Sequence, residues 1–274
     1  MIHLEDFPNE IFLEIFKYFT LSDLFDSFVD LNYRINALLQ SINERSLILN
    51  KPEDVLHPRV FFFKRNIQHL QIRHPSKVDF QCFPNLRSLT SLFPRDQQLI
   101  GLRPKKMPHL THLTIGFLGI WDCEIMLKLC QRIFSNKFHN LRYCSLWPPA
   151  FNDTCTTKTT PTINHIRLQE GTLDDLRVIL NVCPNLKRLQ VNSNSIEVNT
   201  NWYFLRQILV SMFAKVPVQF IHHENIERLE VSFVRYDGMW FEKLDWLFAS
   251  LFNVKHLVIS LCLIQADLER KSVV

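Results

Sequence analysis

The sequence predicts an α/β protein in which a small module of three helices precedes an irregular solenoid, with parallel strands on the concave face and helices on the convex face. Three observations favour this fold: apolar residues at helical spacing near the N-terminus, a short apolar motif that recurs along the rest of the chain, and helical stretches that lead into the next motif. The chain has 274 residues, of which 47% are hydrophobic and 21% charged, enough apolar material for a buried core. We expect a helical module over residues 1–42, a linking or capping segment over 43–64, and repeats over 65–274.

The first predicted helix follows Asp6, with Pro8 in its first turn, where a missing N–H costs nothing. Apolar residues then recur on one broad face, at Ile11, Phe12, Ile15, Phe16 and Phe19.

A second helix start follows at once. Thr20 and Asp23 have the spacing of a capping box, in which the hydroxyl and the carboxylate satisfy exposed N–H groups. A third short helix is expected over residues 33–39. Domains this small rarely bury enough apolar surface to be stable alone, so the module needs a surface to pack against. One interpretation is that its helices simply cap the core that follows.

A resemblance to a known family offers another interpretation. The string Phe7-Pro8-Asn9-Glu10-Ile11, the pair Asp23-Leu24 and the run from Leu31 to Ile35 resemble the F-box, over residues 4–40. Phe7 stands where that family usually has Leu, and Ile35 where Phe or Trp is common, so both positions stay apolar. The resemblance implies binding to a Skp-type adaptor that bridges to a cullin-RING ubiquitin ligase. The adaptor-facing residues that it implies are Phe7, Pro8, Ile11, Phe12, Ile15, Phe16 and Leu24.

The recurring motif is an apolar residue, two mostly polar residues, a second apolar residue (usually Leu), one further residue and an apolar residue. Its first apolar positions are 67, 86, 110, 141, 163, 186, 226 and 254, and Asn precedes six of these eight. The steps between them range from 19 to 40 residues. Units of this length resemble the leucine-rich repeat, in which each unit contributes one strand and one return segment.

Four return segments show helical spacing, over residues 120–134, 172–182, 202–213 and 240–251. Longer insertions over 94–107, 147–161 and 216–224 are expected to be surface loops.

Strand side chains alternate in direction, so the residues between the buried positions of each motif should share the concave face. Their composition is basic and aromatic, which suits a protein partner with an acidic or phosphorylated segment. The predicted target-binding residues are His112, Tyr143, Trp147, His165, Arg167, Arg188, Gln190, Arg228, Glu230 and His256.

Charge divides between the two parts of the chain. Residues 1–40 carry a net charge of −5 and the remainder +9, which indicates different partners. The basic excess is dispersed, so we do not expect nucleic acid as the partner. The seven cysteines form no Cys-x-x-Cys pair and are expected to be free buried thiols. With an acidic N-terminus and no long apolar run, we expect an intracellular protein, cytoplasmic or nuclear, that does not enter a membrane.

Motifs for catalysis are not apparent. The five glycines form no phosphate-binding loop, and His222 and His223 are adjacent rather than at metal-ligand spacing. We therefore expect no enzyme activity, no metal and no cofactor. Two functions compete: a substrate-recognition subunit of a Skp/cullin/F-box ubiquitin ligase, and a non-ligase interaction scaffold whose N-terminal helices act only as a cap.

Overall fold

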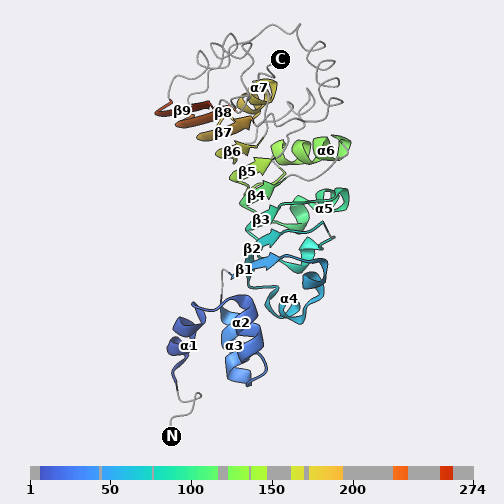
Figure 1. The fold of residues 1–274 in the computed structure, drawn as a ribbon, viewed down its shortest axis with the longest axis vertical. Coiled ribbons are helices and arrows are strands. Elements are labelled where there is room, and N and C mark those ends of the chain that lie inside the picture. The colour runs from blue at the N-terminus through green and yellow to red at the C-terminus, as the bar shows by residue number, and fades with distance from the viewer. Residues whose placement is uncertain are drawn as a thin grey trace, which may run out of the picture. The chain divides into compact units, whose positions relative to one another are not determined.

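The computed structural model describes residues 7–42, 45–75, 77–116, 123–135, 137–146, 162–169, 173–193, 225–233 and 254–261 (Figure 1). The chain divides into two compact units, Met1–Ser145 and Leu146–Val274. Both units consist of parallel strands with helices between them, which confirms the expected α/β class and its solenoid-like repetition.

The first unit opens with three short helices, α1 (Asn9–Phe16), α2 (Leu21–Phe28) and α3 (Tyr33–Ser41). The predicted capping box is present at α2, where Thr20 Oγ1 accepts from the N–H of Asp23 at 3.2 Å and the N–H of Thr20 donates to the Asp23 carboxylate at 3.1 Å. The Thr20 hydroxyl also donates to the Asp23 carboxylate at 2.6 Å, and this hydrogen bond, together with that from the Thr20 N–H, lowers the pKa of Asp23. Asn32 caps α3 in the same manner, because its side-chain oxygen accepts from the N–H of Ile35 at 2.8 Å.

Parallel strands follow in sequence order. They are β1 (Arg45–Leu49), β2 (Ile67–Ile72), β3 (Ser88–Ser91), β4 (His112–Ile115) and β5 (Tyr143–Leu146). The segments between them form η2 (Pro52–Leu56), α4 (Pro58–Phe63), η3 (Phe80–Cys82), α5 (Asp96–Gly101), η4 (Pro104–Lys106) and α6 (Cys123–Phe134). In Figure 1, α4, α5 and α6 lie on one side of the strands of the first unit. We call the opposite face of the strands the open face.

The second unit repeats this arrangement. Its elements are β6 (His165–Leu168), α7 (Leu173–Val182), β7 (Arg188–Ser193), β8 (Arg228–Phe233) and β9 (His256–Leu261), and each strand pairs in parallel with the next. Ile166, Leu168, Leu189 and Leu229 are buried, and so are Ile179 and Leu180 of α7. Strand and helix therefore share one core.

Burial alternates along the strands as the motif predicts. Leu70 and Ile72 of β2 are buried, whereas His69 before them is exposed and Gln71 between them is half-buried. Leu89 and Leu113 occupy the same register positions on β3 and β4, and both are fully buried. The period of two thus separates core positions from open-face positions, with Ser145 of β5 as an exception, because it is buried where alternation places it on the open face.

Asparagines at the start of the motifs link neighbouring repeats. The side-chain amide of Asn85 donates to the carbonyl of Arg65 at 2.7 Å, Asn140 to that of Pro108 at 2.8 Å, and Asn225 to that of Pro184 at 2.8 Å. Each acceptor carbonyl belongs to the residue just before the same motif position one repeat earlier. That position is residue 66 for Asn85, residue 109 for Asn140 and residue 185 for Asn225. We refer to these contacts as asparagine rungs. They explain why Asn recurs at this position in the sequence.

The connecting segments contain more regular structure than expected. The segment 43–64, expected to link or cap, contains β1, η2 and α4, and β1 pairs with β2. Residues 94–107, expected to be a loop, contain α5 and η4 and bury Leu99, Leu102 and Met107. The helices predicted at 120–134 and 172–182 are present as α6 and α7 within the described residues. The predictions for 147–161, 202–213, 216–224 and 240–251 lie outside the described residues.

Four of the cysteines form no disulfide. Cys130, Cys144 and Cys183 are buried as expected, while Cys82 is exposed. Across the described ranges, no helix combines the length and hydropathy needed to span a membrane.

Candidate protein-interaction surfaces

Helix α1 has apolar residues on two of its faces. Phe12 and Phe16 are 1% and 0% exposed and pack into the unit. Ile11 and Ile15, four residues apart on the helix, are 44% and 39% exposed, and Phe7, two residues before its first residue Asn9, is 40% exposed. We call these three residues the α1 apolar stripe. A folded chain rarely aligns large exposed apolar side chains on one helix face unless that face binds something.

The residues expected to face an adaptor therefore fall into two groups. Phe7, Pro8, Ile11 and Ile15 are exposed. Phe12, Phe16 and Leu24 are buried, because they hold the three helices together, so they lie beneath the surface on which a partner would dock. The rings of Phe16 and Phe28 meet edge to face, with centroids 5.0 Å apart, which fixes α1 against α2.

Arg34 positions the first turn of α1. Its Nη2 donates to the carbonyl of Phe7 at 2.6 Å and its Nε to Oδ1 of Asn9 at 2.8 Å, while the guanidinium lies 5.7 Å from the ring centroid of Phe12. Arg34 thus fixes the end of α1 that carries Phe7 and Pro8. Sequence reasoning missed this role, since a lone arginine after Tyr33 gives no local signal of a partner 27 residues earlier.

Polar contacts connect the helices to the first strands. Arg45 Nη2 donates to the carbonyl of Phe16 at 3.0 Å, and the amide of Asn66 donates to the carbonyls of Gln40 and Ile42 at 2.6 and 2.7 Å. These contacts satisfy carbonyls at the C-terminal ends of α1 and α3.

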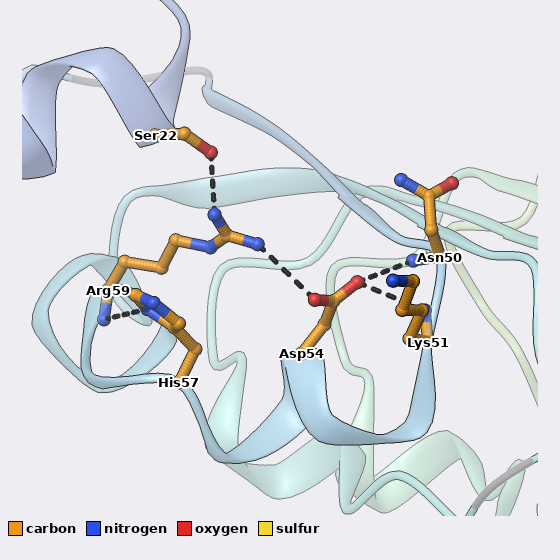
Figure 2. A network of polar contacts seen from close by, with 6 residues as sticks. All are labelled: Ser22, Asn50, Lys51, Asp54, His57 and Arg59. Atoms are coloured by element: carbon orange, nitrogen blue, oxygen red, sulfur yellow. Dashed lines mark hydrogen bonds and ion pairs between the residues drawn. The ribbon is translucent and has the colours of Figure 1, made fainter.

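A second connection joins α2 to the segment after β1 (Figure 2). Arg59 donates from Nη1 to Oγ of Ser22 at 2.7 Å, and its Nη2 lies 3.5 Å from Oδ1 of Asp54. The other oxygen of Asp54 accepts from the backbone N–H groups of Asn50 and Lys51 at 2.8 and 3.0 Å. Burial alone would raise the pKa of Asp54, but the hydrogen bonds from Lys51 and Asn50 and the nearby Arg59 outweigh it, so the pKa lies below its ordinary value.

The open strand face of the first unit brings two predicted target-binding residues together. His112 of β4 is in register with Tyr143 of β5, and their rings stack with centroids 5.7 Å apart. Burial and the neighbouring His69 both lower the pKa of His112. Burial and His69 therefore favour the neutral imidazole of His112 on this face. Trp147, predicted to extend the same face, lies outside the described residues.

The second unit brings together seven predicted target-binding residues. Register places His165, Arg188, Arg228 and His256 in one line across β6, β7, β8 and β9. We call these four residues the basic row. A second line, two residues further along the strands, contains Arg167, Gln190 and Glu230. Glu230 forms an ion pair with Arg228, so the single acid of the predicted set is already neutralised within the chain.

Metal ligation finds no support among the described residues, where no three His, Cys, Asp or Glu side chains gather closely enough to hold an ion. His222 and His223 lie outside that part of the chain.

Compared with protein-family models and with curated protein sequences, the chain matches none.

Proposed function

We propose that the chain is a substrate-recognition subunit of a Skp/cullin/F-box ubiquitin ligase. In this proposal the N-terminal helices are an F-box that docks a Skp-type adaptor, and the strand faces belong to divergent leucine-rich repeats that hold a target protein. The observation that carries the proposal is the α1 apolar stripe, which lies in the segment whose sequence resembles the F-box and leaves Phe7, Ile11 and Ile15 open to a partner.

The competing interpretation, that the helices only cap the repeats, explains the buried residues of the helices but not the exposed apolar residues of α1. A cap needs the buried residues Phe16 and Leu24 and the hydrogen bonds from Arg45 and Asn66. It gives no reason for an apolar stripe on a different face of α1, where water would favour polar side chains. A docking module that also packs against the first strands accounts for both faces.

The test is co-expression of the full chain with a Skp-type adaptor, followed by affinity capture. Replacing Ile11 and Ile15 together with Glu should abolish capture, because two charges would then be desolvated at the interface. The matched control is Leu56→Glu, which places a charge on another exposed apolar side chain of the first unit and should leave capture intact.

Three results would contradict the proposal: no capture by the unmodified chain, capture that survives the double substitution, or equal loss in the Leu56→Glu control. Thermal unfolding of each variant separates loss of docking from loss of folding, since the substituted side chains are at least 39% exposed.

A further inference from the structure

Arg59 of α4 links the N-terminal helices to the first repeat through a serine hydroxyl (Figure 2). Its Nη1 donates to Oγ of Ser22, the second residue of α2, at 2.7 Å. The guanidinium is mostly buried, because only 19% of the side chain is exposed. Buried arginines are normally paired with a carboxylate or a phosphate, so a neutral hydroxyl is an unusual main partner for this one.

The donors of Arg59 are only partly used. Among the described residues its Nε is buried and has no hydrogen-bond partner, and its Nη2 reaches Oδ1 of Asp54 only at 3.5 Å, longer than a strong hydrogen bond. Asp54 does not depend on this contact, since its other oxygen accepts from two backbone N–H groups. Arg59 therefore has N–H groups available for a further acceptor beside Ser22.

A phosphoryl group on Ser22 would supply that acceptor. The Oγ that would carry it already lies 2.7 Å from Nη1 of Arg59, so the three terminal oxygens would be within reach of the same guanidinium. Arginine often binds phosphoryl oxygens through two N–H groups at once, and such charge-assisted bonds are roughly twice as strong as neutral ones. The first turn of a helix also favours a negative charge, because its N–H groups lack partners within the helix.

The neighbouring carboxylates do not compete for Arg59. Asp23, the next residue, already accepts from the N–H and the hydroxyl of Thr20 at 3.1 and 2.6 Å. Asp54 keeps its two backbone N–H donors if Arg59 turns toward the phosphoryl group. The contact that would be given up is the long one to Oδ1 of Asp54, which is the weaker of the two contacts that the guanidinium makes.

Ser22 is also within reach of a modifying enzyme. It is half-buried in the first turn of α2, and Thr20 and Asp23 on either side of it are exposed. The ends of helices open more readily than their centres, so this turn can present the hydroxyl to a protein kinase. Asp23 and Asp26, both exposed, provide acidic positions that suit a kinase with a basic substrate groove.

We infer that Ser22 is a phosphorylation site and that Arg59 binds the resulting phosphoserine. A protein kinase would transfer the γ-phosphoryl group of ATP: the bond between Ser22 Oγ and phosphorus forms, the bond from phosphorus to the ADP oxygen breaks, and the hydroxyl proton passes to the base of the kinase. The phosphoserine would hold α2 against α4 more firmly than the hydroxyl does. The inference is independent of the proposed function, because both helices belong to one compact unit whatever they bind.

The test uses the full chain with phosphoserine incorporated in place of Ser22 by an expanded genetic code. In a phosphorus NMR titration, the phosphoserine should have a pKa below its ordinary value of about 6, because Arg59 stabilises the dianion. Amide hydrogen exchange in α2 should slow by about tenfold, as one additional charge-assisted hydrogen bond predicts. Both effects should be lost in Arg59→Gln.

The matched control is phosphoserine in place of Ser27, an exposed serine in the last turn of the same helix. It lies five residues further along, on another side of the helix and near the end where a negative charge is disfavoured. Its pKa should not be lowered, and exchange in α2 should not slow. If Arg59→Gln does not fold, the comparison of the two phosphorylated chains still decides the result.

Modification itself is measured by mass spectrometry of the full chain purified from eukaryotic cells in the presence of phosphatase inhibitors, with Ser22→Ala as the control. Phosphate on Ser22 supports the inference, and its absence from Ser22 overturns it. An unshifted titration, or slowed exchange that persists in Arg59→Gln, would show that Arg59 does not bind the phosphoserine. Faster exchange in α2 after phosphorylation would show that repulsion by Asp54 dominates, which also contradicts the inference.

Discussion

The side-chain amide of Asn85 donates to the backbone carbonyl of Arg65 at 2.7 Å, across the boundary between two repeats. The acceptor carbonyl precedes Asn66, the residue that occupies the same motif position one repeat earlier. Asn140 and Asn225 repeat the relationship with Pro108 and Pro184. A hydrogen bond that recurs with the repeat is a structural element of the fold and not an isolated contact.

Substitution of an asparagine rung should destabilise the first unit. Asn85→Ala removes a side-chain donor to a backbone carbonyl and should lower the free energy of unfolding by about 1 kcal/mol. Chemical denaturation monitored by circular dichroism measures the change. The converse substitution, His109→Asn, places a rung where the sequence lacks one and should raise stability by a similar amount, with the carbonyl of Pro84 as acceptor. A His109→Asn variant less stable than the unmodified chain would contradict this explanation of the motif.

Loss of Arg34 should loosen the start of α1. Arg34→Met removes the bonds to Phe7 and Asn9 while keeping an apolar side chain against Phe12, so faster hydrogen exchange is expected at the amides of Ile11 and Phe12. Exchange in β3 serves as the internal control. If the proposed docking is right, the adaptor affinity should fall as well. Unchanged exchange at α1 would show that Arg34 does not fix this turn.

Asp54 should make the junction between α2 and β1 sensitive to acid. Its pKa is below the ordinary value of 3.8, so the ionised carboxylate stabilises the folded state above about that pH. This contribution is lost as the pH falls through the lower folded-state pKa. The stability difference between the unmodified chain and Asp54→Asn should therefore be constant near neutral pH and shrink in acid, as measured by denaturation across pH. A difference that grows in acid would contradict this prediction.

His112 should contribute to acid destabilisation at milder pH. Its pKa is lowered from 6.5 by burial and by His69, so the folded state favours the neutral ring. Stability linked to His112 is complete above pH 6.5 and declines as the pH falls from there toward the folded-state pKa. His112→Gln should reduce this decline, and a histidine titration followed by NMR should place His112 below 6.5. A midpoint above that value would show that its surroundings favour the charged ring instead.

The sequence predicted the strands well, for a physical reason. Each motif has a period of two, six of the eight begin with an asparagine, and every one of the eight coincides with a strand, β2 to β9. β1 was missed because Glu44 stands where the motif has its first apolar residue, although Asn43 and the buried pair Leu47 and Leu49 fit the rest of the pattern. Helix α5 was missed because its 6 residues are too few to show the helical period of apolar residues.

The candidate sites were predicted less completely. Helical spacing identified the apolar residues of α1, but it could not separate Phe12 and Phe16, which face the core, from Ile11 and Ile15, which face outward. On the strands, alternation separated exposed His69 from buried Leu70 and Ile72, but it placed Ser145 on the open face, where the structure has it buried. The pairing of Arg228 with Glu230 and the line formed by the basic row depend on register between strands, which no single motif encodes.

The asparagine rungs also determine which insertions and deletions the fold tolerates. Asn85 bonds to a carbonyl 20 residues earlier, whereas Asn225 bonds to one 41 residues earlier, yet both reach the same motif position. The starting point of a strand is therefore independent of how much chain precedes it. Insertions and deletions between repeats can accumulate without shifting the alignment of neighbouring strands. Such a scaffold can change its connecting segments freely while the spacing of its binding residues stays fixed.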